Sequence, residues 1–154
     1  MTGLVPCYEP KPSQAIVPVA VCESYRQDYA RLFVTALLIS GSATRAERAI
    51  EQSIELLDLD GMPGEREILI AVLRAALAGS GARAAVCVRE AHLPDELRAV
   101  LSLDADLRSC FVLRRLVGLT AEETARLTAL GASDVQAFTL AAILQLAGVA
   151  EGVQ

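Results

Sequence analysis

The chain has 154 residues, of which 53% are hydrophobic and 21% are charged, and its formal net charge is −5. This composition can bury a substantial core and excludes an intrinsically disordered chain, while the acidic balance weakens the case for a nucleic-acid-binding protein. The length is enough for one compact domain or for two small ones.

The first part of the chain divides into a proline-rich lead-in and a group of helices. Four of the six prolines fall within the first 20 residues, so residues 1–22 are predicted to be extended. Apolar residues then recur at helical spacing as far as Gly41, and Thr44 with Glu47 has the pattern of a capping box that opens a second helix. With a third helix ending near the glycines that follow, we predict an N-terminal helical domain over residues 23–79.

Residues 80–92 are predicted to be a linker, because small and flexible residues stand at its start. Within it the run ARAAVCVREA fits either a fourth helix or a linker. A second helical domain is predicted over residues 93–148. Its first helix is predicted to begin at Pro94, and Asp104 is placed to cap the next helix, which is predicted to end at Gly118.

The stretch from Leu119 to Leu146 has the outline of a helix-turn-helix. Thr120 and Glu123 form a capping box for a short helix predicted to stop at Gly131, and a second helix is predicted to start at Ser133. In such motifs the second helix usually enters a DNA groove. The sequence as a whole therefore predicts an all-α fold: two small helical bundles joined by a linker, the second of which contains a helix-turn-helix.

Two blocks of this sequence together match a known pattern. The first is YRQDYARLFVTALLISGSATRAERAIEQSIELLD (Tyr25–Asp58), and the second runs from Leu93 to Leu146 and contains LRRLVGLTAEETARLTALGAS. The two blocks resemble the extracytoplasmic-function (ECF) family of RNA polymerase sigma factors, and the second is similar to that family's Gly-Leu-Ser/Thr and Glu-Glu-hydrophobic-Ala signature. The resemblance implies a first domain that binds RNA polymerase and melts the promoter, and a second that reads promoter DNA.

The helix expected to read DNA departs from the family pattern. No Lys or Arg follows Arg126, although phosphate contacts supply much of the affinity for DNA and come largely from those residues. The candidate DNA-binding residues are the polar residues of this helix and the one basic doublet before it: Ser133, Gln136, Thr139, Arg114 and Arg115. DNA binding is therefore doubtful on electrostatic grounds.

The N-terminal block also departs from the family pattern. The helix that contacts polymerase in the family typically reads Asp-Leu-Val-Gln-Glu, whereas this chain has Arg48-Ala49-Ile50-Glu51-Gln52. The third helix contains no aromatic residue, and capture of unpaired bases needs aromatic faces.

We therefore expect a degenerate sigma-factor-like protein of transcription regulation that has lost promoter reading and acts through protein contacts. The expected partner is a protein: the RNA polymerase core, an anti-sigma factor or a second copy of the chain. The candidate interface residues are Phe138, Leu140, Leu144, Arg48 and Glu51. The alternatives are a functional ECF sigma factor that binds polymerase and promoter DNA, and a helical protein of unrelated function.

An enzyme is not expected. His92 is the single histidine, and Cys87 or Cys110 would act as a nucleophile only if the fold brought it to His92. The four cysteines form no CxxC pair, so no metal and no cofactor are predicted. No signal peptide is visible, and the apolar stretches are shorter than the ~18 residues of a membrane span. The expected location is the cytoplasm, away from membranes.

Overall fold

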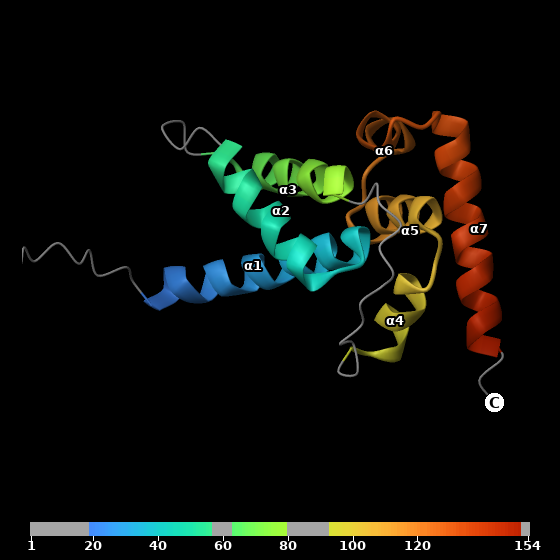
Figure 1. Ribbon diagram of the computed structural model, residues 1–154, viewed down its shortest axis with the longest axis horizontal. Coiled ribbons are helices and arrows are strands. Elements are labelled where there is room, and N and C mark those ends of the chain that lie inside the picture. Colours follow the sequence, from blue (N-terminus) through green and yellow to red (C-terminus); the bar gives the residue numbers. More distant parts are fainter. Residues whose placement is uncertain (1–18, 57–62, 80–92, 152–154) are drawn as a thin grey trace, which may run out of the picture.

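The computed structural model describes residues 19–56, 63–79 and 93–151, and within these ranges the chain is helical and contains no strand. This confirms the predicted all-α class. The helices are α1 (Val19–Ser40), α2 (Ala43–Leu56), α3 (Glu65–Gly79), α4 (Asp95–Leu101), α5 (Ala105–Phe111), the π-helical turn η2 (Val112–Leu116), α6 (Ala121–Thr128) and α7 (Ala132–Glu151) (Figure 1).

Two boundaries in the first half differ from the prediction. Helix α1 begins at Val19, so the last four residues of the predicted extended lead-in are helical; residues 1–18 lie outside the described residues. Helix α2 begins at Ala43, and the carbonyl of Ser42 accepts the first bond from Ala46 N–H, at 2.9 Å. The start of α2 therefore precedes Thr44. The end of α1 is as predicted, because Gly41 follows it with φ of +72°, a conformation that L side chains rarely adopt.

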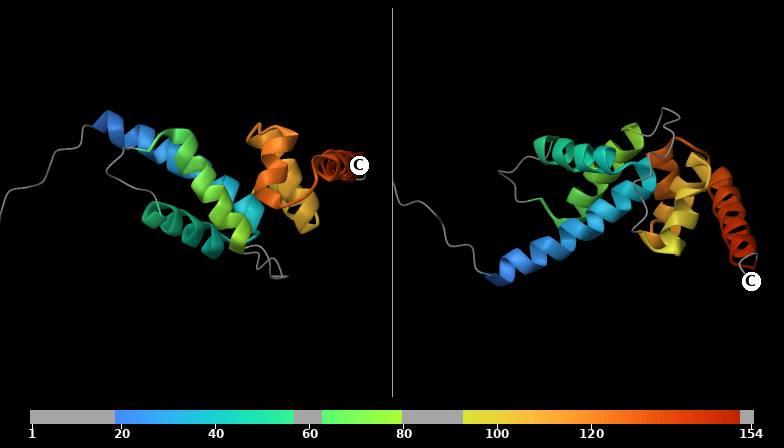
Figure 2. Two further views of the ribbon diagram at one scale, coloured as in Figure 1. Left: turned by 90° about the horizontal axis from the view of Figure 1, so that it is seen from above. Right: turned by 60° about the horizontal axis from the view of Figure 1, so that its bottom comes forward.

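Helices α1, α2 and α3 pack against one another, and α4 to α7 form a second group in which α7 contacts α4, α5 and α6 (Figure 1). Seen from above, the three N-terminal helices lie at one end of the molecule and α7 lies at the other (Figure 2). The predicted linker, residues 80–92, lies outside the described residues.

The two groups share one hydrophobic core. Its fully buried side chains include Leu38 and Ile39 of α1, Leu73 of α3 and Leu113 of η2. Helix α1 contacts α4, α5 and η2 as well as its own neighbours, and α3 contacts α6. Burial of large apolar side chains is the main source of stability, so the contact between the groups is part of what holds the fold.

A buried arginine joins the groups at the end of α1. Arg108 of α5 is only 7% exposed, and its guanidinium donates hydrogen bonds to the carbonyls of Leu101 (3.1 Å), Leu103 (3.2 Å) and Ile39 (3.4 Å). These carbonyls lie at or just beyond the C-terminal ends of α4 and α1, where helix dipoles favour a cation. A Cβ on Gly41 would lie 3.2 Å from the same guanidinium.

The predicted helix ending at Gly118 is present but changes form. After α5 it widens into η2, in which Val117 N–H bonds to Val112 O at 2.9 Å, five residues back. Gly118 then adopts φ of +82°, and Leu119 N–H bonds back to Leu113 O at 2.9 Å. This turn sets the direction in which α6 leaves the core.

Candidate functional site

Helix α6 begins with the predicted capping box. Thr120 Oγ1 accepts a hydrogen bond from Glu123 N–H at 3.1 Å, and Glu123 Oε2 accepts one from Thr120 N–H at 2.9 Å. The helix ends earlier than predicted: Ala129 already has φ of +57°, so this residue, not Gly131, breaks it.

Helix α7 begins directly after the turn Ala129–Gly131. The carbonyl of Gly131 accepts the first bond of α7, from Val135 N–H at 2.9 Å, so α7 starts at Ala132 and Ser133 lies in its first turn. A Cβ on Gly131 would lie 3.0 Å from Asp134 Oδ2, which favours glycine at this position. The chain turns by 100° between α6 and α7. The two helices are therefore joined by a short, sharp turn.

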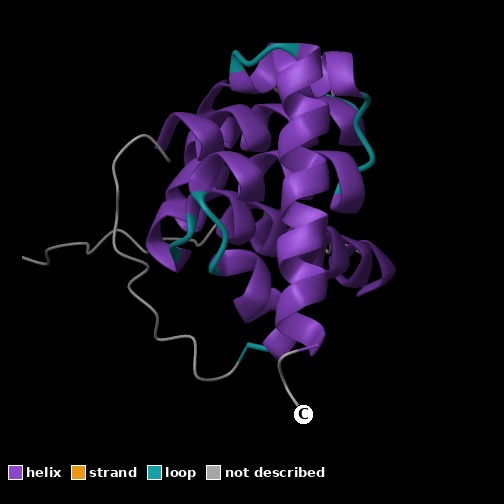
Figure 3. Cartoon of the chain, turned by 90° about the vertical axis from the view of Figure 1, so that its right-hand side faces the viewer, coloured by secondary structure: helices purple, strands orange, loops and turns teal. Residues whose placement is uncertain are grey.

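The outer side of α7 is open to solvent along most of its length. Helix α7 lies at the edge of the molecule, and its full length is seen from that side (Figure 3). Leu140 is 58% exposed and Leu144 is 64% exposed. The exposed residues of its first 14 positions are Ser133, Asp134, Gln136, Ala137, Leu140, Ala141, Leu144 and Gln145.

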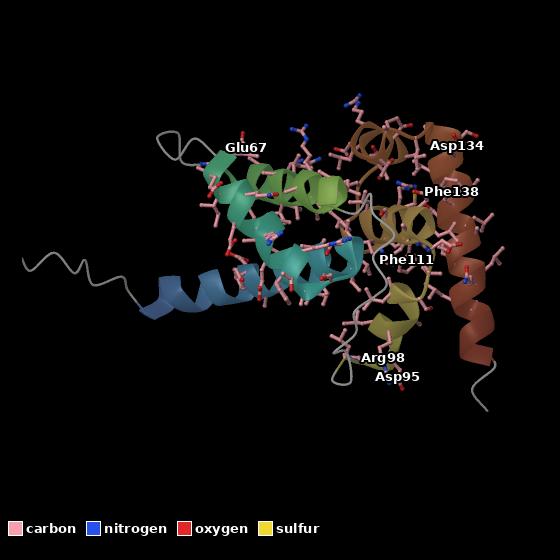
Figure 4. The ribbon with its side chains drawn as sticks, in the orientation of Figure 1. Glu67, Asp95, Arg98, Phe111, Asp134 and Phe138 are labelled. Atoms are coloured by element: carbon pink, nitrogen blue, oxygen red, sulfur yellow. The ribbon has the colours of Figure 1, made fainter. Side chains whose placement is uncertain are left out.

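The structure therefore places Ser133 and Gln136 on the same exposed side as Leu140 and Leu144. This side combines two candidate DNA-binding residues with two candidate interface residues. Its one charged group in this stretch is Asp134, at the N-terminal end of the helix (Figure 4). A carboxylate at that end suits the helix dipole but repels phosphate.

Two predicted residues of α7 are placed elsewhere. Thr139 is only 8% exposed, and its hydroxyl donates to Val135 O at 2.6 Å, so this side chain does not face a DNA groove at the open side of α7. Phe138 is half-buried and packs against the cluster of Cys110, Ala121 and Val135 (Figure 4). Phe138 thus fastens α7 to α5 and α6 and does not lie on the open side with Leu140.

The two arginines of the basic doublet before α6 have different environments. Arg114 is half-buried and its Nη1 donates to Leu119 O at 2.7 Å, which uses the side chain to hold the turn between η2 and α6. Arg115 is exposed. Arg115 is therefore the arginine of the pair whose guanidinium is exposed to solvent.

The candidate residues of the first half lie on a different helix from those of α7. Arg48 and Glu51 are exposed on α2, which packs with α1 and α3 (Figure 2). The predicted interface residues that are exposed therefore lie on two separate helices, α2 and α7.

Sequence reasoning missed two features that involve α3. A groove of about 750 Å³ runs between α2 and α3, with a mostly apolar floor and charged edges. Its lining residues are Gln52, Glu55, Leu56, Arg66, Glu67, Ile70, Ala71, Arg74, Ala75 and Ala78. From its edge Arg66 also forms an ion pair with Glu123, which links α3 to the capping box of α6. The groove depends on how the consecutive helices α2 and α3 pack, and the ion pair joins residues 57 positions apart, so neither follows from a local sequence pattern.

The thiol considered as a nucleophile has no access to solvent. Cys110 is fully buried, and burial, together with the nearby Asp106, raises the pKa of its thiol to about 11. Since the thiolate is the reactive form, this environment disfavours nucleophilic chemistry at Cys110. Cys87 and His92 lie outside the described residues.

Within the ranges that the structure describes, no group of three or more His, Cys, Asp or Glu side chains is arranged to hold a metal ion. No single described helix is long and apolar enough to cross a membrane; α6 and α7 reach that length and composition only when taken together across their 100° bend. Comparison with family models, curated proteins and solved structures gives no significant match to this chain.

Proposed function

We propose that the chain is a sigma-factor-like regulator of transcription that no longer reads promoter DNA and acts through protein contacts. The observation that carries the proposal is the open side of α7. Where a promoter reader needs cations and polar groups, this side presents Leu140 and Leu144, each more than half exposed. The resemblance of residues 25–58 and 93–146 to ECF sigma factors supplies the link to transcription.

The electrostatics of the second half support the loss of DNA binding. Phosphate contacts from Lys and Arg provide most of the non-specific affinity for DNA and position the protein for base contacts. Helix α7 contains no Lys or Arg, and two of the preceding arginines serve the fold, since Arg108 is buried and Arg114 bonds to Leu119 O. Arg115 and Arg126 are exposed, but neither lies on α7. Ser133 and Gln136 alone give little basis for reading bases in a groove.

The protein partner that fits the resemblance is the RNA polymerase core or an anti-sigma factor. The surface for it is the open side of α2, the helix that corresponds to the polymerase-binding helix of the family, although Arg48 and Glu51 stand where the family has other residues. Both side chains are exposed and are free to make charged contacts at the rim of an interface.

A gel-shift assay at low salt tests the loss of DNA binding. The full chain is expected to shift no promoter fragment, with or without core polymerase. The double variant Gln136→Arg with Leu140→Arg restores two cations on the open side of α7 and should produce weak, salt-sensitive binding, which shows that the assay can detect it. A salt-sensitive and sequence-selective shift by the wild-type chain would contradict the proposal and indicate a functional sigma factor.

A pull-down with the tagged full chain tests whether the protein acts through protein contacts. Recovery of polymerase subunits, reduced at least tenfold by Arg48→Ala with Glu51→Ala, is the expected result. The matched control changes another exposed pair, Glu122→Ala with Arg126→Ala on α6, and should leave recovery unchanged. Recovery of a membrane-bound inhibitor in place of polymerase would assign the partner as an anti-sigma factor, and equal loss in both variants would argue against the α2 surface.

A further inference from the structure

The open side of α7 carries a repeat that is typical of paired helices. Its central residues are Ser133, Ala137, Leu140, Leu144 and Ala147, all exposed, at alternating intervals of four and three residues. This spacing averages 3.5 residues, the heptad repeat with which two helices pack along a shared seam. We name these five residues the α7 seam.

The α7 seam is bordered by neutral side chains. Gln136, Ala141, Gln145 and Gly148 flank it, and all four are exposed. No charged residue occurs between Asp134 and Glu151. Between its two ends, where Asp134 and Glu151 stand, the seam therefore lets the acidic chain, with a net charge of −5, meet another acidic surface without like charges facing each other.

A helix with the same neutral seam fits this surface, and a second copy of the chain supplies one. In an antiparallel pair centred at residue 142, Leu140 of one copy lies level with Leu144 of the other, and Ala137 lies level with Ala147. Large residues then meet large residues, small residues meet small ones, and the helix dipoles oppose each other. A two-fold interface requires this self-complementarity.

We infer that the α7 seam pairs with the α7 seam of a second copy, so that the chain forms a two-fold homodimer through the helix that would read DNA in a promoter reader. The inference rests on the proposed function only in naming that role, since the seam and its spacing are properties of α7 itself. One helix provides a smaller contact than the ~800 Å² per partner of a standard interface, so the dimer is weak. Its dissociation constant is expected on the order of 10–100 µM.

Sedimentation equilibrium of the full chain from 1 to 300 µM, under reducing conditions, tests the pairing. The wild-type chain is expected to pass from monomer to dimer in this range. Leu140→Gln with Leu144→Gln keeps the charge and good helix propensity but removes the two apolar knobs, and should weaken dimerisation at least about 30-fold. The matched control, Ile54→Gln with Leu56→Gln, changes two exposed apolar residues of α2 and should dimerise like the wild type.

A second variant makes the test independent of how α7 tolerates glutamine. Ala137→Glu with Ala147→Glu keeps both leucines and places like charges level with each other across the antiparallel pair, so it too should remain monomeric. Circular dichroism checks that each variant keeps its helix content. A wild-type chain that is monomeric at 300 µM, or a dimer that survives in a folded seam variant, would overturn the inference. A dimer that also shifts promoter DNA would contradict the proposed function and leave the pairing established.

Discussion

At the scale of single residues, Arg108 shows how much one buried charge contributes to the fold. Its guanidinium bonds to carbonyls of Ile39, Leu101 and Leu103, which belong to two different helix ends and the turn that follows one of them. Without this side chain, the three carbonyls would stay in the interior and lose the hydrogen bonds that Arg108 donates. An unsatisfied buried polar group costs ~1–3 kcal/mol, and hydrogen bonds to a charged group contribute more than neutral ones.

Replacing Arg108 with Met is therefore expected to lower the free energy of unfolding by roughly 3 kcal/mol, because the apolar chain fills the space but donates no hydrogen bond. Urea unfolding at neutral pH measures the change. Arg115→Met is the matched control: this arginine is exposed, and its loss should stay within about 0.5 kcal/mol. Equal midpoints for the two variants would show that the buried guanidinium adds nothing to stability.

The roles of individual side chains were the part least open to prediction from the sequence. Nothing in the local pattern separates Arg108, which is buried, from Arg115, which is exposed. Thr139 and Gln136 are both polar and three residues apart on α7, yet Thr139 points inward. Burial at these positions is decided by which helix lies opposite, and this is a property of the tertiary packing.

At the scale of elements, the capping box of α6 is the point where a local signal and a long-range contact meet. Thr120 and Glu123 were predictable because they are three residues apart. The contact of Glu123 with Arg66 of α3 was not, because these residues are 57 positions apart. The backbone N–H of Thr120, and secondarily Arg66, lower the pKa of the Glu123 carboxyl, with burial opposing them in part.

Because its folded-state pKa lies below the unfolded value, ionised Glu123 stabilises the fold at neutral pH. That contribution is complete above the usual glutamate pKa, about 4.3, and is lost as the pH falls through the lower folded-state value. Glu123→Gln should therefore be less stable than the wild type at pH 7, and the difference should shrink below about pH 4.3. Thermal unfolding across this pH range provides the measurement.

The neighbouring exposed glutamate offers a control for that experiment. Glu122→Gln removes the same charge from the first turn of α6 but leaves the capping box and Arg66 in place. Its stability across the same pH range is the baseline with which the Glu123→Gln curve is compared. A Glu123→Gln curve that runs parallel to the Glu122→Gln curve down to acid pH would refute a special role for the capping carboxylate.

Most helices were predictable from periodicity, turn residues and caps, while some of their ends were not. Gly41, Gly118 and Pro94 mark boundaries as expected, since each has a backbone reason to stand there. The predicted start of α1 was wrong by four residues, because the prolines suggested an extended segment as far as residue 22, whereas the helix begins at Val19. Ala129 ends α6 although glycine stands two residues later, and sequence preference alone does not predict a left-handed alanine.

At the scale of the whole molecule, the two helical groups share one hydrophobic core. The sequence predicted two bundles because periodicity describes each helix and says nothing of which distant helix covers its apolar face. In the structure Leu113 of η2 is completely buried in the same core as Leu38 and Leu73. A shared core makes unfolding of one group expose apolar surface of the other, which is the physical basis of cooperative unfolding.

Leu113→Ala tests this coupling from the C-terminal side. Truncating a fully buried leucine costs ~2–5 kcal/mol, and in a single cooperative unit the loss reaches every amide that exchanges by global unfolding. Hydrogen exchange measured by mass spectrometry should therefore show protection lowered by the same free energy in α2 and α3 as in α5 and α7. Leu116→Ala, three residues along η2 but 50% exposed, should change protection far less. If Leu113→Ala lowers protection in α5 and α7 while α2 and α3 keep theirs, the groups unfold separately and the contact between them is not what stabilises α1 to α3.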